Sequence, residues 1–134
     1  MTHLYLNPPN LFPSEQYGFS QGVVTSGGRL VFLSGQVGWN ADQEMVGPGD
    51  LRAQTWESLR NVERALHVAG GTLADVASLR IYIRQDQLDD TRAVSDGLKA
   101  FFPAGRFPAA TWIGVPGLAN ESFLIEIEAT AVVA

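Results

Sequence analysis

A segment with the period of an α-helix is followed closely by one with the period of a β-strand, and this succession constrains the fold most. Across residues 51–69, apolar or small residues recur every three or four positions, which gives a helix one continuous apolar face. Gly70 and Gly71 supply a stop for that helix. Across residues 77–84, apolar and polar residues alternate, which is typical of a strand with one buried face. The sequence therefore predicts a helix packed against a sheet.

The amino-terminal part predicts a hairpin followed by a long loop. Residues 19–25 and 30–34 are rich in β-forming side chains and flank a Ser-Gly-Gly-Arg turn, so we expect them to pair antiparallel. Residues 38–50 are rich in glycine and polar side chains and predict a loop. Asp50 at its end is placed to cap the helix that follows.

The carboxyl-terminal half predicts a second helix over residues 89–102 and strands over 110–115 and 123–130. The resulting order β-β-α-β-α-β-β predicts an α+β fold with a mixed sheet and both helices on one face. The other face then lacks a cover. We place Tyr82, Trp112 and Leu124 on that face and expect it to be buried against other subunits.

Length and composition restrict the class of protein. The 134 residues predict a single domain over residues 1–134, and the lack of cysteine excludes a disulfide scaffold, a thiolate zinc site and a cysteine nucleophile. A net charge of −5 argues against nucleic-acid binding. The lack of cysteine also favours an intracellular protein that needs no cofactor. No segment is long and apolar enough to span a membrane, so we expect a cytoplasmic protein.

A series of short segments, in order along the chain, resembles the Rid (reactive intermediate deaminase, YjgF) family. The similarity begins at about Tyr17 and covers nearly all of the remaining chain. No one segment is decisive, but the ordered set is specific. The segments are Tyr17-Gly18-Phe19-Ser20-Gln21-Gly22, Leu33-Ser34-Gly35-Gln36-Val37, Asn61 with Ala69-Gly70-Gly71 and Asp75-Val76, Phe101-Phe102, Phe107-Pro108-Ala109, and Ile125-Glu126-Ile127-Glu128-Ala129-Thr130-Ala131-Val132.

The resemblance implies a chorismate-mutase-like α+β fold and a homotrimer with ligand sites at the subunit interfaces. Active Rid enzymes hydrolyse reactive imines and enamines to a 2-keto acid and ammonia without a metal or an organic cofactor. Small-molecule imines or enamines, and no nucleic acid or membrane, are therefore the expected partners.

The resemblance also indicates site residues. Glu126 matches the family glutamate that positions the attacking water, and we take it as the catalytic residue. Ser34 and Gly35 can offer a hydroxyl and a backbone amide, and Thr111 keeps the hydroxyl of a family Ser/Thr position. Ser95 falls where many members carry asparagine near the cleft. Each of these hydroxyl groups also has an ordinary local hydrogen-bonding role as its alternative.

Three positions depart from the family pattern. Ala110 stands where active members hold the substrate carboxylate with an arginine, whose planar fork suits a carboxylate. Phe19 replaces a tyrosine and so lacks its hydroxyl. Trp112 either narrows the pocket and favours larger or aromatic ligands, or fills a core between subunits.

Two functions follow from these departures. The first is a Rid-like imine or enamine deaminase with an altered substrate, and the alternative is a non-catalytic trimer that binds a small metabolite as a sensor or partner. Arg80, Arg84 and Arg106 are candidates to replace the missing arginine, although exposed arginines are more often only solvated. Ribonuclease activity fits the acidic composition poorly.

Overall fold

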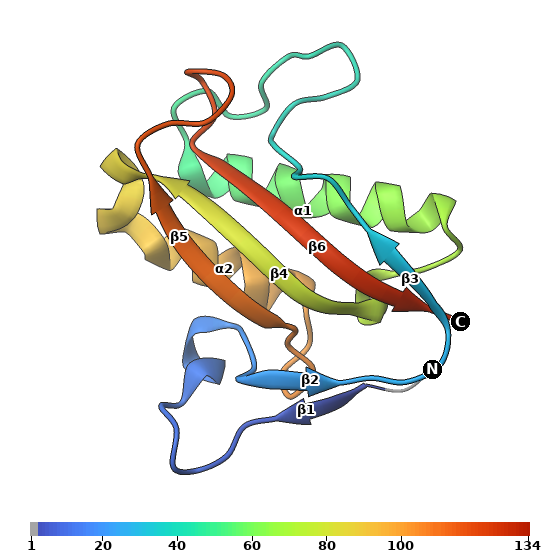
Figure 1. Ribbon diagram of the computed structural model, residues 1–134. Coiled ribbons are helices and arrows are strands. Elements are labelled where there is room, and N and C mark those ends of the chain that lie inside the picture. Colours follow the sequence, from blue (N-terminus) through green and yellow to red (C-terminus); the bar gives the residue numbers. More distant parts are fainter. Residues whose placement is uncertain (1–2) are drawn as a thin grey trace.

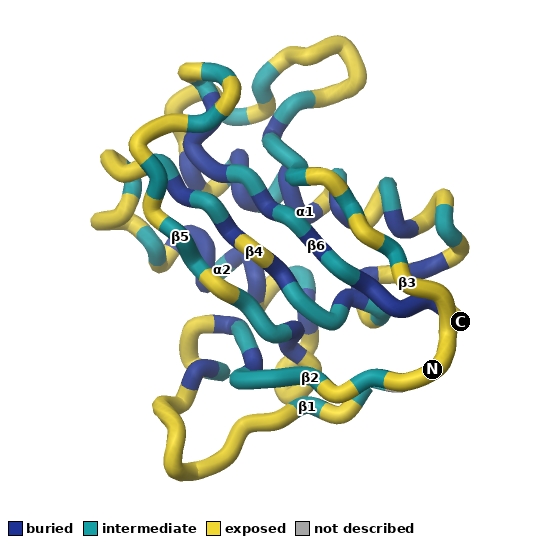
Figure 2. Tube along the Cα trace, viewed as in Figure 1, coloured by how far each residue is buried: buried dark blue, intermediate teal, exposed yellow. Residues whose placement is uncertain are grey.

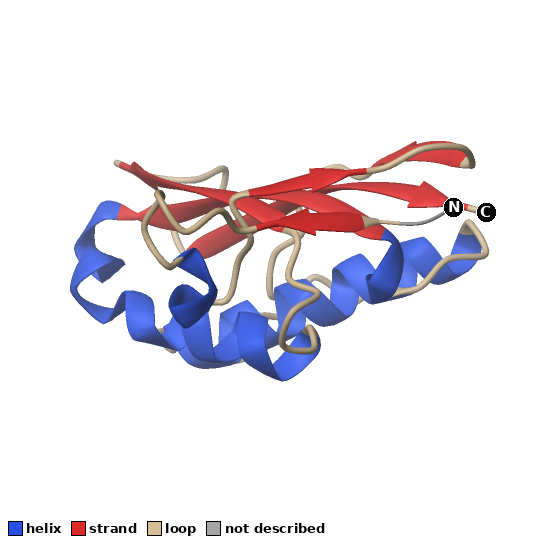
Figure 3. Cartoon of the chain, turned by 90° about the horizontal axis from the view of Figure 1, so that it is seen from below, coloured by secondary structure: helices blue, strands red, loops and turns tan. Residues whose placement is uncertain are grey.

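The fold is a four-stranded sheet with both α-helices on one of its faces (Figures 1 and 3). The structure is a computed structural model that describes residues 3–134. Strand order is β3-β6-β4-β5, with β4 antiparallel to β6 and parallel to β5, and β3 antiparallel to β6. The elements are β3 (Arg29–Phe32), α1 (Leu51–Val68), β4 (Val76–Arg84), α2 (Thr91–Phe101), β5 (Ala109–Val115) and β6 (Ile125–Val133). The predicted α+β fold with a mixed sheet is confirmed.

The predicted hairpin of residues 19–25 and 30–34 is wrong. Strand β2 (Gly22–Val24) pairs with a strand that we did not predict, β1 (Leu4–Leu6), and forms a separate ribbon. Strand β3 pairs instead with the long strand β6. Gly27 and Gly28 do have φ angles of 71° and 70°, but this turn leads the chain from one sheet to the other. The sequence therefore predicted the turn correctly, whereas β3 pairs with β6, which is distant in the sequence.

The helices begin and end largely where their sequence signals predict. The Asp50 carboxylate accepts a hydrogen bond of 3.1 Å from the Ala53 amide and caps α1. Helix α2 begins two residues later than expected, because a 3-10 helix, η3 (Gln85–Asp90), precedes it. The predicted apolar face of α1 packs on the sheet and is fully buried at Leu59, Val62 and Leu66 (Figure 2). Two other short 3-10 helices are η1 (Ser14–Tyr17) and η2 (Leu73–Asp75).

The sheet face opposite the helices is uncovered, but its residues differ from those predicted. Trp112 pairs with the fully buried Ile81 across β5 and β4, so it faces the helices, and Leu124 is buried just before β6. Placing these two residues on the uncovered face was wrong. Tyr82 does lie there, and the edge strand β3 adds Leu30 and Phe32, which are 65% and 74% exposed. The uncovered face therefore remains apolar at one edge.

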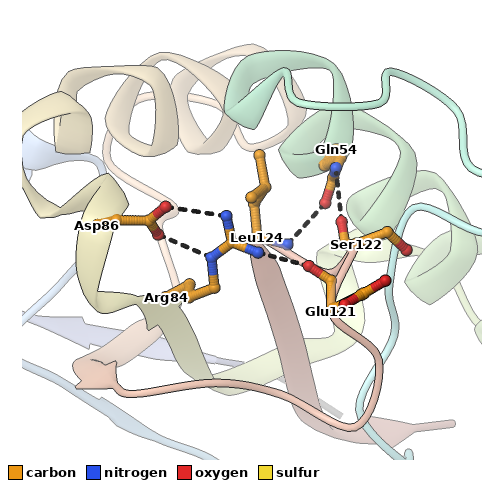
Figure 4. Close-up of polar contacts among 6 residues, drawn as sticks. All are labelled: Gln54, Arg84, Asp86, Glu121, Ser122 and Leu124. Carbon is orange, nitrogen blue, oxygen red and sulfur yellow. Dashed lines mark hydrogen bonds and ion pairs between the residues drawn. The ribbon is translucent and has the colours of Figure 1, made fainter.

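A polar network joins the loop before β6 to α1 and β4 (Figure 4). The buried Gln54 side chain donates to the carbonyl groups of Gly47 and Ser122 and accepts from the Leu124 amide at 2.9 Å. Arg84 binds both carboxylate oxygens of Asp86, at 2.7 and 2.9 Å. Hydrogen bonding by Arg84 lowers the pKa of the Asp86 carboxyl group below its usual value. Arg84 thus has a structural role.

Candidate active site

The main chain after β3 forms a bulge against β6. The Leu33 amide donates to the carbonyl of Ala129 at 3.0 Å. The Gln36 amide donates to the carbonyl of Ile127 at 2.7 Å, so three steps along one strand match two steps along β6. Ser34 and Gly35 together therefore lie opposite the single residue Glu128, which is the geometry of a β-bulge. A bulge interrupts the ladder of hydrogen bonds and leaves backbone groups free for other partners.

Both backbone amides of this bulge are available to a ligand. Neither Ser34 nor Gly35 donates an amide hydrogen bond to any residue between positions 3 and 134. Ser34 is exposed, and its backbone carbonyl accepts a hydrogen bond of 3.0 Å from the Gln36 side chain. The bulge thus offers two backbone amides and a hydroxyl group, which are donors that can bind oxygen atoms.

The carboxylate of Glu126 lies against this bulge. A β-carbon at Gly35 would come within 2.7 Å of Glu126 Cδ, so only glycine leaves the carboxylate its place. Within residues 3–134, Glu126 has no hydrogen bond and no ion pair. Glu126 is only partly buried, on the uncovered face. It is therefore a free carboxylate beside two free amides.

Glu128, two residues along the same face of β6, is already engaged. The Tyr82 hydroxyl donates to it at 2.9 Å, and an Arg80 nitrogen lies 4.0 Å from its other oxygen. Hydrogen bonding to Glu128 raises the pKa of the Tyr82 hydroxyl above its usual value. Of the two glutamates, Glu126 is the one free to handle a proton of a ligand or of water.

Phe19, Ala110 and Trp112 form a second group, on the other side of the sheet. Ala110 and Trp112 face the helices from edge strand β5 and are partly buried against the core. The rings of Phe19 and Trp112 have centroids 6.0 Å apart, and Phe12 packs on Phe19 at 6.1 Å. Position 110 thus lies two residues before Trp112 on the same side of β5, near an aromatic wall, and it carries no charge.

Within one chain, none of the three candidate arginines takes the place of a cation at position 110. Arg84 is held by Asp86, and Arg80 lies on the uncovered face beside Thr111. Arg106 is exposed and lies near Tyr5. Burial raises the pKa of the Tyr5 hydroxyl above its usual value, and the charge of Arg106 partly opposes this rise. In the single chain, the contacts of Arg80 and Arg84 are therefore with acidic residues and not with position 110.

The sites predicted from sequence are thus divided between the two faces. Glu126, Ser34, Gly35 and the exposed Thr111 belong to the uncovered face, whereas Phe19, Ala110 and Trp112 belong to the helix side. Strand β4 runs between β6 and β5 and keeps Glu126 apart from Ala110. A pocket that uses both groups needs a second copy of the chain to supply one of them.

Ser95 lies in a groove that sequence reasoning did not foresee. It is nearly buried on α2 and lines a groove of about 330 Å³ together with Tyr17, Arg92 and Lys99. The groove forms where η1 packs on α2, and this packing depends on Gly18, which has a φ of 95°. The packing of η1 on α2 joins segments about 80 residues apart, so no local sequence signal marked the groove.

Among residues 3–134, no three His, Asp or Glu side chains are grouped as metal ligands. In the same part of the chain, neither helix has the length and apolar composition of a membrane span. His3 Nε2 lies 3.0 Å from the Asp75 carbonyl oxygen, and His67 is exposed in the last turn of α1.

Comparison with known proteins decides the family. Residues 12–133 match the family described as Endoribonuclease L-PSP, which is the Rid (YjgF) family. The chain belongs to the Rid family. A Rid protein of unknown function from Yersinia pestis, YyfB, has a solved structure that superposes with a TM-score of 0.93 at 41% identity, covering 99% of this chain and 100% of that one. The resemblance seen in the sequence is thus confirmed.

Two further proteins are similar to this chain over most of its length. A protein from the mite Dermatophagoides farinae named 2-iminobutanoate/2-iminopropanoate deaminase is 31% identical over 92% of this chain and 91% of its own length. The structure of Rv2704 from Mycobacterium tuberculosis has a TM-score of 0.67 at 32% identity, covering 98% of this chain and all of that one. The fold is therefore that of the Rid family, as the sequence predicted.

Proposed function

We propose that this Rid protein hydrolyses a reactive imine or enamine to a carbonyl compound and ammonia, with Glu126 as the catalytic residue. The observation that carries the proposal is the free Glu126 carboxylate that lies against Gly35, in a bulge where the amides of Ser34 and Gly35 are both free. The deaminase named among its relatives supports the same reaction class.

The reaction follows from what these groups can do. Glu126 takes a proton from a water molecule as the water oxygen forms a bond to the imine carbon. The protonated Glu126 returns this proton to the imine nitrogen, which gives a carbinolamine. A second proton then moves from the carbinolamine hydroxyl to the nitrogen through Glu126, the carbon–nitrogen bond breaks, and ammonia leaves. The water oxygen remains as the carbonyl oxygen, and the bulge amides donate hydrogen bonds to that oxygen as charge develops on it. The step needs no redox change.

The working unit of this proposal is a homotrimer. The uncovered sheet face exposes apolar side chains at β3, and such a face is expected to be covered by other subunits. Subunit packing also offers a way to bring the Glu126 group of one copy near the Phe19, Ala110 and Trp112 group of the next. The cytoplasmic location predicted from the sequence stays a prediction.

The substrate differs from that of arginine-bearing Rid enzymes in this proposal. Ala110 offers no donor for a carboxylate next to the imine carbon, and Trp112 with Phe19 supplies a flat apolar surface in its vicinity. We therefore expect slow turnover of short 2-imino acids and faster turnover of imines with a larger apolar body. The name Endoribonuclease L-PSP suggests RNA cleavage, but the net charge of −5 weighs against an RNA partner.

The test is ammonia release from a panel of freshly generated imines. Turnover above the uncatalysed rate that disappears in Glu126→Gln supports the hydrolase. Saturable binding of the corresponding carbonyl compounds without turnover supports the alternative, a metabolite-binding trimer that lacks catalysis because position 110 carries no cation.

A further inference from the structure

Most of the cations of this chain already have partners. Of the nine Lys and Arg residues, five form hydrogen bonds or ion pairs within 4.0 Å and a sixth stacks on Phe101. The other three have no hydrogen bond, ion pair or aromatic stacking contact with any residue from 3 to 134. The engaged residues are Arg29, Arg52, Arg64, Arg80, Arg84 and, by stacking, Arg60; the remaining three are Arg92, Lys99 and Arg106.

Two of these three unpartnered cations, Arg92 and Lys99, line the same groove. The groove runs between η1 and α2, and its volume of about 330 Å³ is at the small end of the range of roughly 300–1,000 Å³ for small-molecule sites. Tyr17 and Ser95 contribute a phenol and a hydroxyl group to it. Gly18 holds the two walls together, because a β-carbon there would lie 2.9 Å from Leu98 Cβ.

The groove keeps a net positive charge. Its acidic residue, Asp96, is bound by Arg52 at 2.8 Å, so it does not neutralise Arg92 or Lys99. Two uncompensated cations side by side are unexpected on a protein of net charge −5. Cations with a neighbouring phenol and hydroxyl are the donors that a carboxylate needs.

The segment of residues 17–19 connects the groove to the aromatic wall of the candidate active site. Tyr17 lines the groove, Gly18 packs on α2, and Phe19 contacts Trp112, so one short segment links the two features. A ligand with an apolar body on Phe19 and Trp112 can therefore extend an acidic group toward Lys99 and Arg92.

We infer that the groove of Tyr17, Arg92, Ser95 and Lys99 binds the carboxylate of an imine substrate whose acidic group lies at the far end of an apolar body. This inference rests on the proposed hydrolase function and names its substrate class. It also gives a Rid protein with Ala110 a way to recognise an acid, through cations on helix α2 instead of on strand β5.

The test uses a matched pair of stable probes, 3-phenylpropanoate and the neutral 3-phenylpropanamide, which differ in the charged group. Binding to the full protein is followed by calorimetry and by amide NMR shifts. We expect the acid to shift the amides of Tyr17, Ser95 and Lys99. In the double variant Arg92→Gln/Lys99→Gln, its Kd should rise about tenfold, the order expected for losing charge-assisted hydrogen bonds at an exposed site. The Kd of the amide should stay unchanged.

Arg106→Gln is the control, because Arg106 is the unpartnered cation outside the groove. Equal affinity of wild type and double variant for the acid, or no binding of the acid by wild type, would overturn the inference. Charge-dependent binding without ammonia release from any imine would support the groove as a carboxylate site and would reject the proposed hydrolase function. The two failures are therefore distinguishable.

Discussion

Gly35 lies directly against the side chain of Glu126, where a β-carbon at position 35 would be 2.7 Å from Glu126 Cδ. This contact ties the bulge after β3 to the carboxylate that we propose as catalytic. The atoms in the way belong to a flexible side chain, so Gly35→Ala should move the carboxylate without disrupting the sheet.

The first prediction concerns this contact. Gly35→Ala should lower kcat for imine hydrolysis by about 100-fold, since a displacement of about 1 Å can cost that much, while the melting temperature stays close to that of wild type. Initial rates of ammonia release and thermal unfolding measure the two effects. Because both substitutions act on one carboxylate, the double variant should be no slower than Glu126→Gln alone, and an additive loss would refute the coupling.

The second prediction concerns position 110. Ala110→Arg should raise kcat/KM for 2-iminobutanoate by about ten- to a hundredfold, because a guanidinium can grip the carboxylate beside the imine carbon with two hydrogen bonds. Ala110→Met is the matched control for added volume without charge. No gain in Ala110→Arg, with the fold intact by circular dichroism, would show that the alanine does not limit short substrates.

The parts of the fold that the sequence predicted are those set by interactions between residues close together in the chain. The period of residues 51–69, the Asp50 cap and the alternation in β4 are local signals, and the structure confirms them. The partner of β3 was missed because pairing with β6 joins residues about a hundred positions apart. The alternation in β5 was correct, but which face Trp112 occupies depends on its register with Ile81.

The candidate site divides in the same way. Family segments pointed to Glu126, Ser34 and Gly35, and the structure places these three together. The bulge that frees the two amides was not predicted, since it arises from how β3 meets β6. The division of the site residues between two sheet faces likewise appears only once the strand order is known.

The third prediction concerns assembly. Phe32 is 74% exposed on β3, and its burial against another copy is expected to stabilise the trimer. Phe32→Glu should therefore convert trimers to monomers in sedimentation equilibrium and abolish turnover, since one group of site residues would be lost. Val68→Glu, at an 88% exposed position on α1, should leave both mass and activity unchanged. A wild-type protein that sediments as a monomer would contradict this account.

The fourth prediction concerns pH. The hydrogen bond to Glu128 is the main cause of the raised pKa of Tyr82, so this interaction stabilises the fold below the unfolded pKa of about 10. That stabilisation should be lost as the pH rises through the folded pKa of Tyr82. In Glu128→Gln, the pKa of Tyr82 should fall back toward 10, as followed by NMR of the phenol carbon. Tyr5, whose pKa is raised mainly by burial, is the internal reference and should not change.

The comparison of two glutamates on one strand tests the central claim most directly. The initial rate of ammonia release from an imine turned over by wild type should be measured for Glu126→Gln and Glu128→Gln under the same conditions. Because Glu126 is free and Glu128 is bound by Tyr82, the first change should lower kcat by about 10²- to 10⁴-fold. The second should leave kcat near the wild-type value. Equal losses in the two variants, or full activity in Glu126→Gln, would contradict the assignment of Glu126 as the catalytic residue.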